Sequence, residues 1–354
     1  MGDRGEPEIE VSSVQDAAQV AAVVKKSRVC ISAVMYSEAG ETVVQACAEN
    51  GCDYVDCAAV PPLLKTWIKN YDQTARRNGV ALIHGAGALA LPMDVMVGAA
   101  ARAIATRWGA KTRDVTFCLE ELDTNLSSGT VRTILSQAAL GPKVIQKAQE
   151  PSALSPINHT AGDVAKSGVY RDPVLGHLSN SSVSADQNRA FIYRSWGLLE
   201  GIDKGYGPNF TYNEYNRVNS TLAGVVLLLQ FYAINFIIGL ARFGPIRNYL
   251  LKHAPTPGAG PTDEIARSSK VGMELLAKPD ITAPGKFVNM KFSWAGGHYP
   301  LTAMLMSQTA ASLIYHRELE GGIKGGCLTP AILGNDLLER IGQAGAQVTT
   351  VFSD

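Results

Sequence analysis

The chain has 354 residues, of which 32 are Lys or Arg and 32 are Asp or Glu, so its formal net charge is zero. No basic run and no alternation of basic and aromatic residues occurs, which excludes the usual composition of a nucleic-acid-binding protein. The length suffices for one large domain or, as we expect, two domains that share a cleft.

The amino terminus and the cysteines both indicate an intracellular protein. The first residues, MGDRGEPEIEVSS, are polar and acidic, unlike a secretion signal or a mitochondrial presequence. The six cysteines form no CxxC pair and no His/Cys metal spacing, and most fall on apolar strand or helix patterns. We therefore expect buried free thiols in a reducing compartment, a cytoplasmic location and no metal site.

The first third of the chain alternates short apolar strands with helices. We predict strands at 28–34, 52–58 and 80–83 and helices at 14–26, 40–50 and 61–78. This alternation indicates an α/β fold with a parallel sheet covered on both faces. Only about 27 residues precede the first strong strand, too few for the first βαβ unit of a doubly wound nucleotide-binding sheet. We therefore predict a truncated Rossmann-like domain over residues 1–112.

A glycine loop, HGAGALA at residues 84–90, joins the strand at 80–83 to a long helix and matches the dinucleotide fingerprint G-x-G-x-x-A. In that fingerprint the helix begins within the glycine run, and Pro92 would then break the helix interior. We instead expect Pro92 to open the helix and Asp94 to cap it. Residues 101–111 also lack the carboxylate expected ~20 residues on for the ribose. The sequence thus predicts a loop shaped by close packing.

From residue 113 the pattern changes to that of an α+β substrate domain with antiparallel strands, which we predict over residues 113–328. Its expected elements are strands at 114–122, 210–218, 271–277 and 286–294 and helices at about 127–149 and 300–318. Residues 151–188 are polar with little periodicity and predict a long surface excursion. Residues 329–354 predict a helix and a closing strand. In one arrangement this helix packs back against the first domain.

Residues 221–241 carry no charge over 21 positions, a length that would allow a transmembrane span. Gln230 and Asn235 near the middle, and the position inside a folded region, argue against a span. Basic residues separated by apolar ones follow, which is typical of a segment on a membrane surface; they are Arg242, Arg247, Lys252 and His253. We favour a buried or pocket-lining helix. The alternatives are peripheral attachment to a membrane or lipid droplet and, less favoured, a true span.

Four stretches carry a resemblance to a known family. They are ETVVQACAENGCDYVDCA, ALIHGAGALALPMD, LLKHAPTPGAGPTDEIAR and GGCLTPAILGNDLLERI. They resemble the saccharopine dehydrogenase-like oxidoreductases, which include the trans-acting enoyl reductases, and the similarity covers most of the chain. The resemblance implies an NAD(P)-type Rossmann domain and a second domain that supplies the substrate pocket.

The chain departs from the family pattern where the family faces its cofactor or substrate. The opening strand and its Gly-Ala-Thr-Gly-type phosphate loop have no counterpart. Where the family has Gly-Pro-Tyr, this chain has Val34-Met35-Tyr36. Where the family has Gly-Glu, this chain has Ala59-Val60, and where the family has Phe-Asp-Ser, this chain has Ala88-Leu89-Ala90. Each change is toward apolar side chains, which would leave a pyrophosphate without donors. We therefore predict a divergent member that binds no cofactor, with NADP as the alternative. A shortened gene start would explain only the missing segment.

Catalytic candidates follow the carboxyl ends of predicted strands, where parallel sheets line a ligand crevice. Tyr36 is placed to donate a hydrogen bond to a substrate carbonyl, His84 to donate or move a proton, and Glu38 lies beside Tyr36. A packed Tyr and a His bonded to backbone are the structural alternatives, and Asp56 is expected to make a strand-end turn bond. Predicted substrate-binding residues are Met35, Val60, Ala88, Leu89, Met93, His298 and Tyr299.

These features favour a cofactor-independent isomerase or cyclase of specialised metabolism, acting on an apolar polyketide or terpenoid in a hydrophobic cleft, including by an intramolecular (4+2) cycloaddition. The first alternative is an NAD(P)-dependent enoyl reductase of the family. The second is a non-catalytic scaffold or lipid-surface protein. The expected partners are an apolar small molecule, with a lipid surface and a second copy of the chain as further candidates, and no nucleic acid.

Overall fold

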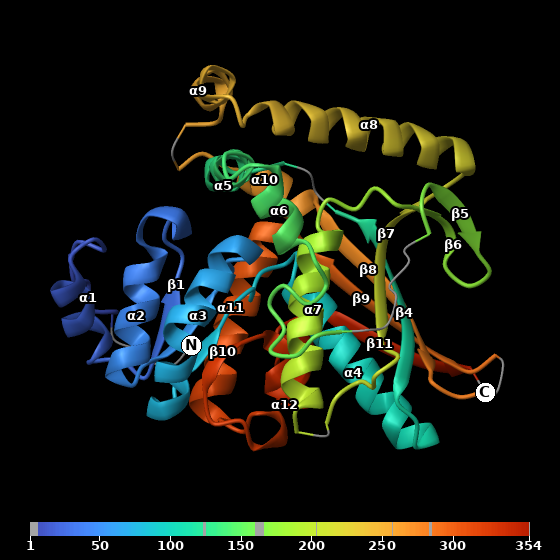
Figure 1. Cartoon of the computed structure of the whole chain (residues 1–354), viewed down its shortest axis with the longest axis horizontal. Coiled ribbons are helices and arrows are strands. Elements are labelled where there is room, and N and C mark those ends of the chain that lie inside the picture. Colours follow the sequence, from blue (N-terminus) through green and yellow to red (C-terminus); the bar gives the residue numbers. More distant parts are fainter. Residues whose placement is uncertain are drawn as a thin grey trace.

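Two β-sheets, each packed against helices, organise the chain (Figure 1). The computed structural model describes residues 6–353 apart from 123–124, 160–165, 203, 257 and 283–284. The first sheet has the order β1-β2-β3-β10 and all its pairings are parallel. Its strands are β1 (Val29–Ser32), β2 (Asp53–Asp56), β3 (Ala81–Ile83) and β10 (Gly326–Leu328). The predicted α/β fold with a Rossmann-like parallel sheet is therefore confirmed.

Alternate residues of this sheet face different helices, as the period of a strand requires. Tyr54 and Leu82 belong to a core shared with α2 (Glu41–Asn50) and α3 (Pro61–Asn78). Val55 and Ile83 belong to the other core, which includes residues of α11 (His298–Tyr315). Both faces of the sheet are thus covered. Helix α1 (Ala17–Val24) packs against α2 at the edge of the molecule.

The second sheet has the order β11-β9-β8-β4-β7-β6-β5. Its strands are β4 (Thr112–Glu121), β5 (Val169–Asp172), β6 (Gly176–Ser179), β7 (Thr211–Val218), β8 (Lys270–Pro279), β9 (Phe287–Ala295) and β11 (Gln347–Ser353). Only the β4–β7 pair is parallel among these pairings, so the expected antiparallel character holds elsewhere. Helix α4 (Leu91–Trp108) packs on β4, β8 and β9 and is buried from Leu91 to Ala101.

After α11 the chain returns to both sheets. Strand β10 pairs with β3, and β11 pairs with β9. Between them lie the 3-10 helix η3 (Pro330–Leu333) and α12 (Gly334–Gln343). The short 3-10 helix η2 (Glu320–Gly322) precedes β10. The carboxyl-terminal segment therefore contacts both halves of the molecule, and the boundaries at residues 112 and 328 stay a prediction.

Two predicted segments differ from the structure. The helix expected at about 127–149 is two helices, α5 (Ser128–Ala138) and α6 (Pro142–Ala148), because Gly141 with φ 82° and Pro142 separate them. The surface excursion expected at 151–188 contains the β5–β6 hairpin and the start of α7 (Ala185–Glu200). Residues 160–165 of that excursion lie outside the described residues. The start of α7 was missed because it buries polar residues such as Asn188, which hide its apolar pattern.

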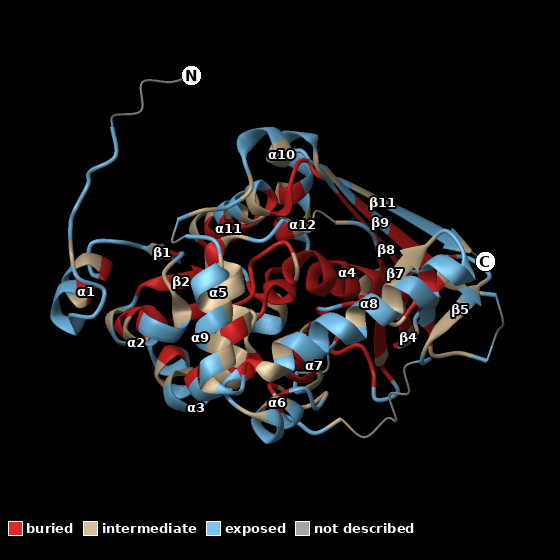
Figure 2. Cartoon of the chain, turned by 90° about the horizontal axis from the view of Figure 1, so that it is seen from above, coloured by how far each residue is buried: buried red, intermediate tan, exposed pale blue. Residues whose placement is uncertain are grey.

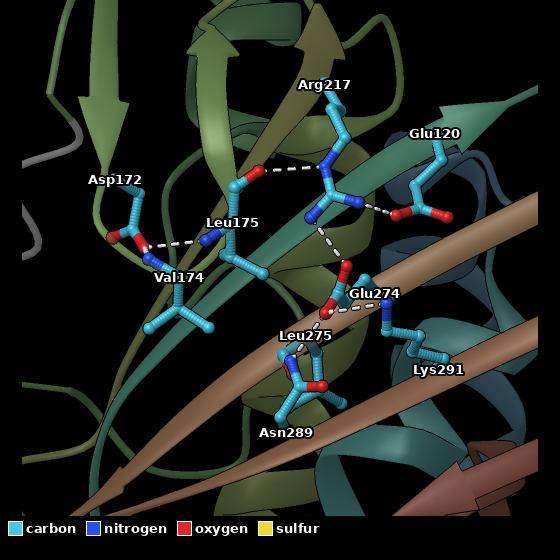
Figure 3. A network of polar contacts seen from close by, with 9 residues as sticks. All are labelled: Glu120, Asp172, Val174, Leu175, Arg217, Glu274, Leu275, Asn289 and Lys291. Atoms are coloured by element: carbon cyan, nitrogen blue, oxygen red, sulfur yellow. Dashed lines mark hydrogen bonds and ion pairs between the residues drawn. The ribbon is translucent and has the colours of Figure 1, made fainter.

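A polar network crosses the second sheet and holds the β5–β6 hairpin (Figure 3). Arg217 on β7 donates to the Leu175 carbonyl at 2.8 Å and to Glu274 at 2.5 Å, and it also pairs with Glu120. Glu274 accepts a second hydrogen bond from Asn289 at 2.8 Å. Because the Glu274 carboxylate is buried, these donors supply the hydrogen bonds that water would otherwise make to it. The turn of the hairpin is thereby tied to β4, β7, β8 and β9.

Helix α8 (Thr221–Leu240) lies on the outside of the molecule, so the favoured prediction of a buried or pocket-lining helix was wrong (Figure 2). Within the part of the chain that the structure describes, α8 is the one helix that is long and apolar enough to cross a membrane by length and composition. Helix α9 (Gly244–His253) follows it directly, and the short helix α10 (Asp263–Ser268) leads into β8.

Candidate active site at the carboxyl edge of the first sheet

The carboxyl ends of β1, β2 and β3 lie side by side, so the residues that follow them meet at one edge of the sheet. Tyr36 begins the short π-helix η1 (Tyr36–Gly40) after β1, Asp56 ends β2, and His84 follows β3 directly. The pairing of Val55 with Ile83 places Asp56 opposite His84. Tyr36 and His84 therefore share one edge, as the sequence predicted.

Asp56 and His84 form a buried pair. The His84 Nδ1 atom lies 2.9 Å from one Asp56 oxygen. The other oxygen accepts hydrogen bonds from the backbone N–H groups of Ala58 at 2.9 Å and Gly85 at 3.3 Å. The predicted strand-end turn bond is present, but the sequence analysis missed that the same carboxylate orients an imidazole. Two strands in parallel register, each followed by a titratable residue, were the signal that could have found it.

The second nitrogen of His84, Nε2, has no hydrogen-bond partner among the described atoms. The ring packs between Trp67, at 5.4 Å between centroids, and Tyr54, at 5.8 Å. The indole Nε1 atom of Trp67 also lacks a partner within the described residues. Buried polar atoms without partners are costly unless a water or ligand atom satisfies them. A polar atom of a bound ligand or water would therefore be stabilised at this cluster by hydrogen bonds.

Tyr36 connects this cluster to the half-buried side of the edge. Its hydroxyl donates to the Ser32 carbonyl at 3.0 Å and accepts from the Cys57 N–H at 3.3 Å, and it lies 3.2 Å from the Cys57 thiol. Burial, with the nearby Cys57 and Asp56, raises the pKa of Tyr36 far above its usual range. The phenol therefore stays protonated and can act as a donor or acid. Glu38, on the same π-helix, is exposed to solvent.

The glycine loop between β3 and α4 uses its backbone donors within the protein. The N–H groups of Gly85 and Ala86 bond to Asp56, and that of Ala88 bonds to the Thr302 hydroxyl at 3.1 Å. Gly85 has φ 74°, and a Cβ there would clash with the ring of Phe191. The prediction of a loop shaped by close packing is confirmed.

The start of α4 agrees with this interpretation. The helix begins at Leu91 with Pro92 in its first turn, as the sequence predicted. The backbone N–H groups of Ala90 and Leu91 bond to the Gly87 carbonyl. A pyrophosphate at this loop would therefore find few free donors.

The predicted substrate-binding residues do not form one open cleft. Ala88 and Met93 lie in the hydrophobic core, and their role in substrate binding stays a prediction. Leu89, Val60 and Met35 are half-buried at the same edge. The Met35 sulfur approaches Gly129 at the start of α5.

His298 and Tyr299 open α11 beside the glycine loop. His298 is buried, and its ring lies 4.1 Å from that of Tyr299 between centroids. The Tyr299 hydroxyl accepts from the Ser127 N–H at 2.6 Å and bonds the Thr130 hydroxyl at 2.7 Å, so it fastens the start of α5. One turn later on α11, Thr302 bonds the glycine loop. These residues therefore join α5, α11 and the loop, while Glu38 is not brought to them.

The loops at this edge offer the phosphates of a dinucleotide no cationic side chain and few free backbone donors. The loops at 32–42, 56–62 and 84–92 contain no Lys or Arg. Pro61 and Pro62 open α3, which removes two N–H donors from that helix start. The described residues of these loops therefore do not fit the phosphates of NADP.

Two surface hollows lie away from this edge. One, of about 470 Å³, lies between α4, α12, β9 and β11 and includes Arg102 and Arg107. The other, of about 240 Å³, lies beside η2 and includes Arg76. Neither contains Tyr36, Asp56 or His84, so we locate the candidate site by its chemistry and by strand topology.

Comparison with known proteins shows which proteins this chain is similar to. Residues 6–83 match the model of the saccharopine dehydrogenase NADP binding domain. A putative trans-acting enoyl reductase of Mycobacterium tuberculosis is 26% identical over 347 residues, covering 93% of this chain and 81% of the relative. The chain thus contains a segment similar to the saccharopine dehydrogenase NADP binding domain and resembles trans-acting enoyl reductases over most of its length. A trans-acting enoyl reductase of Mycobacterium bovis is 24% identical over 331 residues, covering 89% of this chain and 78% of the relative.

Among solved structures, a dehydrogenase from Clostridium difficile aligns over 94% of this chain and 80% of its own, at 9% identity and a TM-score of 0.30. A similarity at that level carries no argument about this protein. The fold assignment therefore depends on the sheet topology described above.

The family match overturns the predicted function. A match to an NADP binding domain, in a chain related to enoyl reductases along most of its length, contradicts a cofactor-independent isomerase or cyclase. The prediction that no cofactor binds is wrong for the same reason, and NADP, the stated alternative, is supported. The sequence argument failed because it took one phosphate-binding loop and a few apolar substitutions as a test of the whole cofactor site.

Proposed function

We propose that this protein is an NADP-dependent oxidoreductase that reduces a carbon–carbon double bond conjugated to a carbonyl group in an apolar substrate. The observation that carries the proposal is the similarity to trans-acting enoyl reductases over 93% of the chain, together with the match of residues 6–83 to an NADP binding domain. The edge of the first sheet supports it with a protonated phenol and an Asp–His pair where ligands of parallel sheets bind.

Each group at this edge has a role in such a reaction. NADP, if bound in its reduced form, would supply the hydride, and the protein would hold the carbonyl and deliver one proton to the α-carbon. Tyr36 is the half-buried phenol at this edge, and its raised pKa keeps it protonated, so it can donate a hydrogen bond to a substrate carbonyl oxygen in place of the Ser32 carbonyl. Asp56 fixes the ring of His84, whose Nε2 atom can hold or return that proton. The proposal requires the NADP phosphates to be held by residues outside the loops at 32–42, 56–62 and 84–92.

The test uses the purified chain with NADPH and, as probe, a medium-chain trans-2-enoyl thioester. We expect loss of nicotinamide absorbance and formation of the saturated thioester. Tyr36→Phe should slow turnover by roughly tenfold to a hundredfold, about 1.4 to 2.7 kcal/mol, because one donor to a carbonyl assists without being obligatory. Tyr315→Phe, an exposed tyrosine on α11, is the matched control and should not change turnover.

A measurement of NADPH binding distinguishes a poor choice of substrate from an incorrect proposal of NADP dependence. Calorimetric titration with NADPH should give a dissociation constant well below millimolar even if the enoyl probe is a poor substrate. No binding of NADPH or NADH at millimolar concentration would refute NADP dependence. Conversion of a substrate without added nucleotide would do the same.

A further inference from the structure

The exposed outer side of α8 carries a stripe of apolar residues. Leu222, Val226, Leu229 and Phe236 recur at helical spacing, so they share one side of the helix. Leu229 is 65% exposed and Phe236 is 69% exposed. Over these residues the stripe extends ~20 Å at a rise of about 1.5 Å per residue. Exposed apolar side chains in an unbroken row mark a surface that another apolar phase covers.

The body of the protein does not account for this stripe. At its amino-terminal end α8 packs through Gly224, where a Cβ would clash with Val169 and Val218. At its other end Ile238 packs beside the cluster that contains Leu135 of α5. Only 6% of the most apolar window of the helix is buried. The helix is thus attached on one side, at both ends, while its opposite side faces solvent.

The charges next to the stripe point to an anionic surface. Residues 221–262 contain three strong cations, Arg242, Arg247 and Lys252, and no Asp or Glu. The aromatic rings of Phe243 and Tyr249 are exposed among them, and the Arg242 guanidinium lies 4.6 Å from the Phe243 centroid. Cations and exposed aromatic rings beside an apolar stripe match the headgroup and acyl layers of an anionic phospholipid surface.

We propose that α8 and α9 dock the protein on the surface of an anionic phospholipid layer, with α8 lying in the plane of that layer. A second copy of the chain fits less well, because an α8–α9 contact between copies would offer these cations no carboxylate from the same stretch. A transmembrane span fits less well because both ends of α8 are packed on the folded body. This inference does not depend on the proposed reductase activity.

The experiment is flotation of the full chain with vesicles of phosphatidylcholine, with and without phosphatidylglycerol. We expect cofractionation with the anionic vesicles that high salt weakens. Leu229→Asp and Phe236→Asp should each lower the bound-to-free ratio at least tenfold. Val183→Asp, at another exposed apolar position that is 71% exposed, should leave it unchanged.

A second series tests the charges. Arg242→Gln, Arg247→Gln and Lys252→Gln should each weaken binding to anionic vesicles roughly fivefold, about 1 kcal/mol for each charge removed. Absence of binding to any vesicle would overturn the proposal. Retention after carbonate extraction would overturn it in favour of a span. A dimer in solution that Leu229→Asp dissociates, without vesicle binding, would overturn it in favour of a second copy.

Discussion

Asp94 links three elements that are distant in the sequence. Its side chain, in the first turn of α4, accepts from the Ser195 hydroxyl of α7 at 2.5 Å and from the Ala331 N–H of η3 at 2.8 Å. It makes no capping bond to its own helix, which corrects the sequence prediction of a cap. Burial raises the pKa of Asp94 to about 7, and the hydrogen bonds from Ser195 and Ala331 oppose that rise only in part.

This pKa makes the stability of the protein depend on pH. An Asp in the unfolded chain ionises near pH 3.9. Between about pH 4 and about pH 7 the folded protein therefore keeps a proton that the unfolded chain has lost. The free energy of unfolding falls as the pH rises through this window, by about 1.4 kcal/mol per pH unit for this one group. The Asp94→Asn side chain has the same shape as that of Asp but no ionisable group, so this variant lacks the pH dependence that Asp94 contributes.

Urea denaturation of the wild type and of Asp94→Asn at pH 5, 6 and 7 measures the effect, because contributions of other groups cancel in the difference. We expect the wild type to lose roughly 2 kcal/mol more than the variant between pH 5 and pH 7. Ser136→Ala, a half-buried serine on α5, serves as a variant with ordinary pH dependence. Parallel stability curves for the wild type and Asp94→Asn would refute the reasoning.

Three further predictions concern the glycine loop and the acid–base pair. Gly85→Ala should lower the free energy of unfolding by at least 2 kcal/mol more than Gly51→Ala does, on the order of the overpacking penalty. Both glycines have positive φ, but only Gly85 faces an aromatic ring. Urea denaturation measures both variants, and equal losses of stability would contradict the packing argument. Ala88→Phe should lower the free energy of unfolding by about 1 to 3 kcal/mol, and retained stability would show open space there. Asp56→Asn should slow enoyl reduction roughly tenfold or more and shift its pH profile, while an unchanged profile would separate His84 from the chemistry.

Local signals predicted most of the first domain. Helix α3 has the predicted ends because Pro61 and Pro62 start it and Gly79, with φ 64°, ends it. Pro92 placed the start of α4 in the same way. Such signals act within one turn of the chain, so a single sequence contains all of the information that they need.

Partners distant in the sequence were not predictable in this way. The Asp56–His84 pair depends on the register of two strands, and the burial of Arg194 in α7 depends on carbonyls of Leu154 and Cys327. The return of β10 to the first sheet likewise depends on a pairing that spans most of the chain. The contacts that stabilise these features form only after folding. The sequence therefore shows polar residues but not the partners that they bind.

The sequence by itself determined the strand and helix alternation, the parallel first sheet, the closed glycine loop and the family resemblance, because periodicity and Pro and Gly positions act locally. Only the tertiary structure decided that Ala88 and Met93 are core residues, that Asp56 orients His84, and that α8 lies outside. A run of apolar residues has the same composition whether it faces a core or a solvent. Its environment is set by what the rest of the chain covers, and here the rest of the chain leaves one side of α8 uncovered.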